Sequence, residues 1–167
     1  MKRALCLLLL LAGCAPERGQ TYRDETVPLA ITTRGTLGDL EGDWVVRGTF
    51  APTASLDRIR FAARADGKID VTITHTGCTQ DCPFLSGTWP AERIARNRAR
   101  LLTDSANDPE LWVIWADEAT RTAVIVTPDG RTAAILDRNA KGGADRIEAA
   151  RQVMDFNGYD ISALLMR

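Results

Sequence analysis

The chain has 167 residues, of which 45% are hydrophobic and 26% charged, and its formal net charge is −1. This composition suits one compact domain and excludes a disordered chain, because enough apolar surface is available for a core. The even charge balance also argues against a nucleic-acid partner, which would favour a strongly basic domain.

The first residues have the pattern of a secretion signal. Lys2 and Arg3 supply positive charge, and an apolar run, ALCLLLLLA at 4–12, follows them. A helix of that length covers about 14 Å, about half of the ~30 Å hydrocarbon core of a bilayer. We therefore expect residues 1–13 to be a cleaved signal peptide rather than a membrane span.

The end of this signal resembles the lipobox of bacterial lipoproteins. The junction LAGC at 11–14 places small residues directly before Cys14, which in such proteins is lipidated after cleavage. The alternative is an ordinary signal peptide with an incidental cysteine. The resemblance implies a lipid anchor at Cys14, and two or more acyl chains would hold the protein stably on a membrane.

Ala15 follows the lipobox cysteine, which by the same resemblance favours the outer membrane of the bacterial cell envelope, facing the periplasm. Residues 14–26 are polar and lack hydrophobic periodicity, so we expect them to form a lipidated tether. The folded domain is then expected at residues 27–167.

Short strand-like runs separated by turn signals occupy residues 44–138. Asp66-Gly67 and Asp129-Gly130 favour hairpin turns. We expect eight antiparallel strands, at 44–50, 56–64, 68–75, 84–94, 97–103, 111–116, 121–127 and 131–137. Two of these, 111–116 and 121–127, are apolar on both faces, so the sheet must be covered on its outer side as well.

The segment that follows the strands has the periodicity of an amphipathic helix. In the run at 144–157, the apolar residues Ile147, Ala150, Val153 and Met154 recur at helical spacing. Asn157-Gly158 supplies a left-handed helix end. We expect this helix to cover the outer face of the late strands, and the tail YDISALLM to form a further edge strand or a turn of helix.

A Gly-x-Trp motif occurs twice, at 42–44 and at 87–89. A tryptophan that opens the first strand of a closed barrel can plug one end of it, and the glycine lets the chain turn tightly there. The motif at 42–44, with Arg138 ending the last expected strand, resembles the lipocalin family. The second copy is interrupted by Pro90 and leaves too few residues for eight strands, so we interpret it as coincidence.

The resemblance implies an all-β fold with one C-terminal helix: an eight-stranded antiparallel up-and-down β-barrel in which Arg138 stacks on Trp44. Gly42 belongs to the same signature. The alternative for Arg138 is an exposed cation at a strand end. The sequence departs from the family at 117–119, where Asp-Glu-Ala replaces a Thr-Asp-Tyr-like turn and lacks its aromatic ring.

Period-two alternation then predicts which side chains line the lumen. With Trp44 facing inward, the expected lining is Val46, Gly48, Phe50, Ile59, Phe61, Ile69, Val71, Ile73, Ala134 and Leu136. Such a lumen suits a fatty acid, a lysophospholipid or another small amphiphile, carried for envelope lipid transport or maintenance. The alternative is a barrel filled by these side chains, which would serve as an envelope interaction or scaffold lipoprotein without a small-molecule ligand.

Two cysteines remain in the expected mature domain, Cys78 and Cys82, and we expect a disulfide between them in an oxidising compartment. Zinc is the alternative, but it requires about four nitrogen or sulfur ligands, and His75 is the only histidine. No nucleophile elbow, Walker loop or dinucleotide fingerprint is present. We therefore expect no enzyme activity, no cofactor and no metal.

Overall fold

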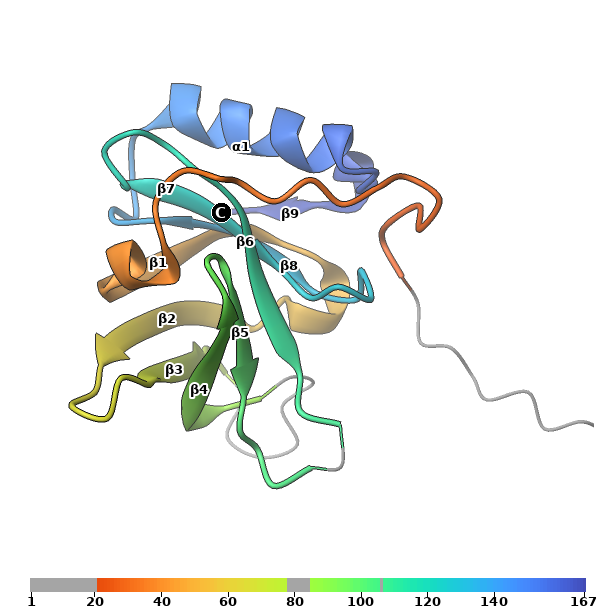
Figure 1. The fold of residues 1–167 in the computed structure, drawn as a ribbon. Helices are drawn as coiled ribbons and strands as arrows, with labels where there is room; N and C mark the ends of the chain where they lie inside the picture. Colours follow the sequence, from red (N-terminus) through yellow and green to blue (C-terminus); the bar gives the residue numbers. More distant parts are fainter. Residues whose placement is uncertain (1–20, 78–84, 106) are drawn as a thin grey trace, which may run out of the picture.

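The computed structural model describes residues 21–77, 85–105 and 107–167, in which eight antiparallel strands form a closed barrel (Figure 1). The strands are β1 (Gly42–Thr49), β2 (Leu56–Ala63), β3 (Ile69–His75), β4 (Gly87–Ala95), β5 (Arg98–Leu101), β6 (Glu110–Ala116), β7 (Thr122–Val126) and β8 (Ala133–Asp137). Neighbours in sequence are neighbours in the sheet, and β1 pairs with both β8 and β2, which closes it. The predicted up-and-down barrel is confirmed.

The remaining elements lie at the two ends and on the outside of the barrel. They are the 3₁₀ helices η1 (Leu37–Leu40), η2 (Ala51–Thr53) and η3 (Ile161–Ala163), the helix α1 (Ala144–Phe156) and the short strand β9 (Leu165–Met166). β9 pairs with the end of β1. Figure 1 shows α1 lying across the outer face of the late strands, as the sequence predicted.

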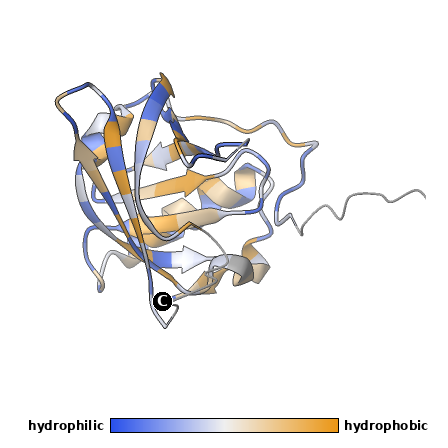
Figure 2. Cartoon of the chain, turned by 90° about the horizontal axis from the view of Figure 1, so that it is seen from below, coloured by the Kyte–Doolittle hydropathy of each residue, from blue (hydrophilic) through white to orange (hydrophobic). Residues whose placement is uncertain are grey.

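The barrel wall separates two hydrophobic cores. The inner core lies within the barrel and the outer core lies between β6, β7, β8 and α1. Hydrophobic residues are concentrated on the strands and hydrophilic ones in the connecting loops (Figure 2). In β7 and β8 every residue is buried, because their alternate side chains serve one core and then the other.

The helix α1 is fixed at both ends. It begins after Gly143 and ends at Asn157, and Gly158 takes the left-handed conformation expected there, with φ +81°. Near its start, Arg146 donates to Asp137 at the end of β8 (Nη2–Oδ2 3.0 Å), whose side chain is fully buried. The Arg146 guanidinium also donates to Thr122 Oγ1 at 2.8 Å, so the helix is pinned to β7 as well.

Residues 21–36, the N-terminal strap, run along the outer core and are part of the fold. The Tyr22 amide donates to the Gly130 carbonyl (3.1 Å), and the Thr32 amide donates to the Ile114 carbonyl (3.0 Å). Tyr22 and Arg23 are buried. Residues 21–26, which the sequence predicts as the end of the tether, therefore pack against the domain, through backbone hydrogen bonds and through the side chains of Tyr22 and Arg23. Residues 1–20, with Cys14, lie outside the described residues.

Candidate ligand site in the barrel

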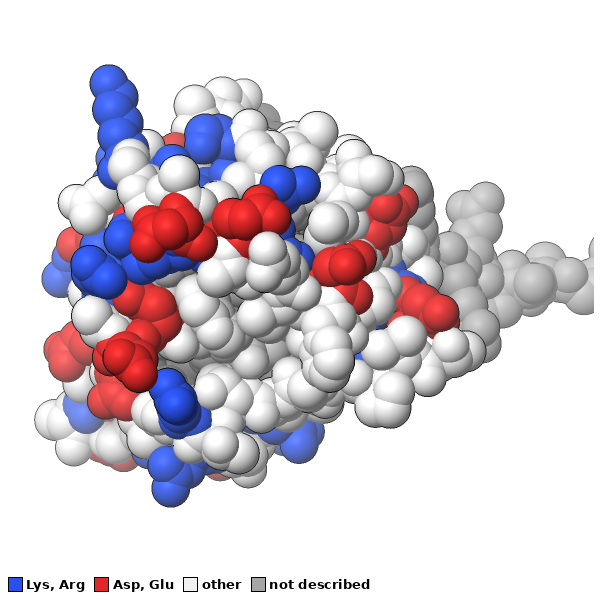
Figure 3. All heavy atoms as spheres, turned by 90° about the horizontal axis from the view of Figure 1, so that it is seen from above, with Lys and Arg blue, Asp and Glu red and all other residues white. Residues whose placement is uncertain are grey.

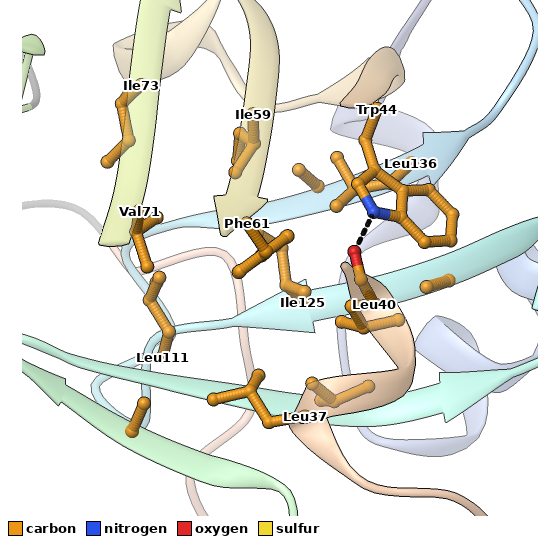
Figure 4. Close-up of a cluster of buried hydrophobic side chains, with 14 of the residues drawn as sticks. Leu37, Leu40, Trp44, Ile59, Phe61, Val71, Ile73, Leu111, Ile125 and Leu136 are labelled. Carbon is orange, nitrogen blue, oxygen red and sulfur yellow. Dashed lines mark hydrogen bonds between the residues drawn. The ribbon is translucent and has the colours of Figure 1, made fainter. Parts of the chain in front are cut away.

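One end of the barrel is closed by Trp44, at the start of β1. Its indole Nε1 donates to the Leu40 carbonyl of η1 at 2.6 Å, and Figure 4 shows the ring packed beside that helix. The Arg138 guanidinium lies over the indole, 3.8 Å from the ring centroid. The predicted stack of Arg138 on Trp44 is confirmed, and the exposed-cation alternative is wrong.

The contact between Arg138 and Trp44 also requires the glycine of the motif, Gly42. Gly42 has φ +103°, which non-glycine residues rarely adopt, and a Cβ added there would lie 2.9 Å from Nη1 of Arg138. Arg138 also donates to the Asp43 carbonyl at 3.2 Å. Burial lowers the pKa of Arg138, and the Asp43 charge partly offsets this, but an arginine remains protonated at physiological pH.

Most of the predicted lining residues lie inside the barrel. The inner core contains Val46, Ile59, Phe61, Ile69, Val71, Ile73, Ala134 and Leu136. Figure 4 shows side chains from β2, β3 and the opposite wall pointing toward one another across the interior. The structure therefore places these residues together, and their role in binding a ligand stays a prediction.

Phe50 is the exception, because a β-bulge lies just before it. Val46 pairs with Leu136, but Gly48 pairs with the adjacent residue Ile135, so β1 has one extra residue at this point. The bulge reverses the alternation of β1. Gly48 and Phe50 thus face the outer core, and their predicted place in the lumen is wrong.

Phe50 instead forms an aromatic stack outside the barrel wall. Its ring centroid lies 4.5 Å from that of Tyr22 in the strap and 6.0 Å from that of Tyr159 after α1. The Tyr159 hydroxyl is buried without a hydrogen-bond partner in the described structure, and burial raises the pKa of Tyr159. The stack joins the two ends of the described chain to the end of β1.

The opposite, open end of the barrel is nearly filled. Its cavity has a volume of about 10 Å³ and is lined by Leu56, Ile59, Ile73, Leu111, Ile125, Val126, Thr132 and Ala134. One water needs about 10–15 Å³, and ligand pockets usually have about 300–1,000 Å³. In this conformation the interior is packed with its own side chains.

A larger hollow, of about 260 Å³, lies at the closed end. It is bounded by the strap, by η1 and by the β6–β7 turn, including Ala116, Asp117 and Glu118. This turn is where the sequence departs from the lipocalin pattern. The Arg34–Glu118 ion pair (Nη1–Oε1 3.4 Å) lies at the same hollow, and both side chains are largely exposed.

Trp89, on β4, is a candidate site residue that the sequence interpretation missed. It pairs with Val71, so its side chain belongs to the inner face. Its indole Nε1 is buried and has no hydrogen-bond partner in the described structure, which costs about 1–3 kcal/mol for a buried donor. The second Gly-x-Trp does not open the barrel, but its tryptophan carries a buried donor that has no partner among the described residues. Alternation along β4, counted from the buried residue Ala91, could have predicted that Trp89 faces inward.

The rim of the open end carries the only histidine of the sequence. His75 Nε2 donates to the Leu85 carbonyl at 3.1 Å, and Nδ1 lies 2.8 Å from Ser55 Oγ. Both ring nitrogens are therefore engaged in holding the rim. Cys78 and Cys82 lie outside the described residues, so the disulfide and its zinc alternative remain predictions.

The described part of the chain contains no cluster of three or more His, Cys, Asp or Glu residues suited to a metal ion. Within the same residues, no helix is long and apolar enough to cross a membrane.

No protein-family model and no curated protein matches the sequence. The structure is similar to the solution NMR structure of lipocalin 12 from rat epididymis, with a TM-score of 0.59 and 15% sequence identity. The similarity covers 84% of this chain and 90% of that one. At this identity the likeness shows the fold alone. With its closed eight-stranded barrel, Trp44 plug and C-terminal helix, the chain has the lipocalin fold.

Proposed function

We propose that this protein is a lipid-anchored carrier that binds a fatty acid, a lysophospholipid or another small amphiphile in its barrel. The observation that supports this most is the apolar interior, which extends from Trp44 to the open end. Among the described residues, the buried charged side chains are Arg23 and Asp137. Both lie outside the barrel wall, so no fully buried charge among the described residues faces the interior.

Binding requires side chains at the open end to move, because the cavity there has only about 10 Å³. Each methylene that leaves water contributes about 0.8 kcal/mol, which offsets the cost of moving them. A carboxylate or phosphate oxygen that reached Trp89 Nε1 would also supply the acceptor that this donor lacks. We therefore expect weak binding of single-chain amphiphiles and none of bulky ones.

The small cavity favours a second candidate function. If the side chains at the open end stay in place, the barrel is a filled scaffold that presents its outer surface to an envelope partner. Small barrels can be filled by their own side chains. The two candidates differ in one measurable property, which is saturable binding of an apolar ligand.

Protein stripped of co-purified lipid is titrated with a fluorescent fatty acid, and lysophospholipid is added as competitor. Ile73→Ala enlarges the cavity at the open end and should tighten binding. Ile135→Ala is the matched control, because Ile135 is equally buried but lies in the outer core. Both should cost about 2–5 kcal/mol of stability. Absence of saturable binding to both wild type and Ile73→Ala would refute the carrier and support the scaffold.

The anchor is tested separately in cells. The proposed site is the outer membrane of a bacterial envelope, with the barrel facing the periplasm. Cys14→Ser should block processing or release the protein into the soluble periplasmic fraction. Membrane retention of a normally processed Cys14→Ser protein would refute the lipid anchor and leave ligand binding unaffected.

A further inference from the structure

The C-terminal end of α1 carries an exposed aromatic side chain. Phe156 is 74% exposed, the most exposed large hydrophobic residue in the described structure. The start of α1 is bound to Asp137, at the closed end of the barrel. The helix therefore runs toward the open end, where Tyr159 bridges to Arg23 in the strap. Phe156, at the C-terminal end of α1, therefore lies on the open-end side of the molecule.

The strap begins at the same rim. Thr21 Oγ1 donates to the Asp129 carbonyl at 3.3 Å, and the Tyr22 amide donates to Gly130, so both contact the β7–β8 hairpin at the open end. The chain between Cys14 and Thr21, even when fully extended, has a length of at most about 25 Å. A lipid on Cys14 therefore holds this rim within that distance of the membrane. In Figure 1 the strap begins beside the C-terminal end of α1.

The charge around Phe156 defines the kind of membrane surface that fits. A groove of about 490 Å³ between the strap and the end of α1 is lined by Asp24, Asp155 and Asp160. The one basic residue in this groove, Arg23, is buried and donates to the Asn157 carbonyl. Figure 3 shows acidic groups at the end of this face where the strap begins. Two further basic side chains at this end, Arg131 and Arg167, are paired with Asp129 and Asp57. The unpaired charge of the groove is therefore negative, so an anionic lipid surface would be repelled, whereas a zwitterionic one would not.

We propose that the open-end rim docks on a zwitterionic phospholipid bilayer with Phe156 inserted at its interface. The barrel then opens at the lipid surface. This docking rests on the lipid anchor proposed above, because one aromatic side chain holds a protein on a membrane only when a tether keeps it there at high effective concentration. Two other exposed apolar side chains lie at this end of the barrel. They are Leu165 and Met166 of β9, which are 46% and 42% exposed, and β9 pairs with the open-end part of β1.

The test uses the full lipidated protein in phosphatidylcholine vesicles, with Cys78→Ser and Cys82→Ser so that one cysteine can be labelled. An environment-sensitive fluorophore is placed at Asp155→Cys, next to Phe156. The matched control is Lys141→Cys, an exposed position in the loop after β8 at the closed end. Quenching by lipids with nitroxide-labelled chains reports contact with the bilayer.

We expect quenching at position 155 to be at least threefold stronger than at position 141. Phe156→Ser should remove most of this difference, and phosphatidylglycerol vesicles should reduce it. Equal quenching at 155 and 141 in protein that floats with the vesicles would overturn the docking and leave the anchor intact. Protein that does not float would overturn the anchor and the docking together. Fatty-acid binding, measured separately, depends on neither result.

Discussion

Arg138, directly after the last barrel strand, lies 3.8 Å above the indole ring of Trp44, near the start of the first. The pair lies where β8 meets β1, and it covers the closed end of the inner core. The contact also explains the glycine two positions before the tryptophan, because the Arg138 guanidinium occupies the space of a Cβ at Gly42.

Gly42→Ala should lower the free energy of unfolding more than Gly67→Ala does. Both glycines have positive φ, +103° and +80°, so both substitutions strain the backbone by about 1–3 kcal/mol. An alanine Cβ at 42 would in addition clash with Arg138, whereas nothing lies within 4 Å at 67. Urea denaturation measures both losses. Equal losses would mean that Arg138 moves away without cost.

Arg146→Ala should destabilise the protein by about 3–5 kcal/mol, because it leaves the fully buried Asp137 carboxylate without its charge partner. Arg151→Ala is the control. It removes a half-exposed pair with Glu148 on the same helix, worth about 0–1 kcal/mol. The melting temperatures of the two variants, measured by thermal unfolding, are compared. Similar melting temperatures would contradict the role of Arg146 in pinning α1.

Phe50→Ala and Phe61→Ala should each cost about 3–5 kcal/mol, since both side chains are buried. They lie on opposite sides of the barrel wall, so only Phe61→Ala should change the affinity for a fluorescent fatty acid. The affinity is measured at a temperature where both variants are folded. A change in the Phe50→Ala protein alone would contradict the position of the bulge in β1.

Acid should destabilise the β6–β7 turn through Asp117. Burial opposes ionisation of this carboxyl, but the Thr122 and Arg121 amides donate to it at 2.7 and 2.6 Å, and with the Arg121 guanidinium they hold the pKa of Asp117 below its ordinary value of 3.8. A lowered pKa in the folded state stabilises the protein above the unfolded pKa, and this stabilisation is lost as the pH falls through the folded value.

The free energy of unfolding should therefore fall below about pH 4, and Asp117→Asn should make this fall shallower. Denaturant titrations between neutral and acidic pH give the slope. Glu118→Gln is the control, because its side chain is 88% exposed and pairs with Arg34. An unchanged slope in Asp117→Asn would show that other carboxyls account for the acid sensitivity.

The strands, the helix and the closed-end signature could be predicted from local patterns. Both bounds of β2 and of β3 lie within one residue of the expected ranges 56–64 and 68–75. Alternation and the Asp66-Gly67 turn determine the position of that hairpin. The Trp44–Arg138 pair was recognisable because its two residues open and close the run of strands.

Three features depend on contacts that alternation does not report. The bulge near Gly48 reverses the facing of Phe50, yet the sequence reads as an unbroken strand. The strap from Thr21 onward is held in part by backbone hydrogen bonds, which any residue except proline can make. The volume of the lumen depends on how side chains from opposite walls interlock, so a list of inward residues does not give it.

The strap also determines how tension on the N-terminus enters the folded domain. A pull at residue 21 first loads the hydrogen bonds of Tyr22 to Gly130 and of Asp24 to Gly158, which couple the strap to a hairpin and to the end of α1. Peeling the strap away would remove Tyr22 from the ring of Phe50 while leaving the barrel hydrogen bonds intact. Tension on the N-terminus would therefore open the outer core before it disturbs the interior of the barrel.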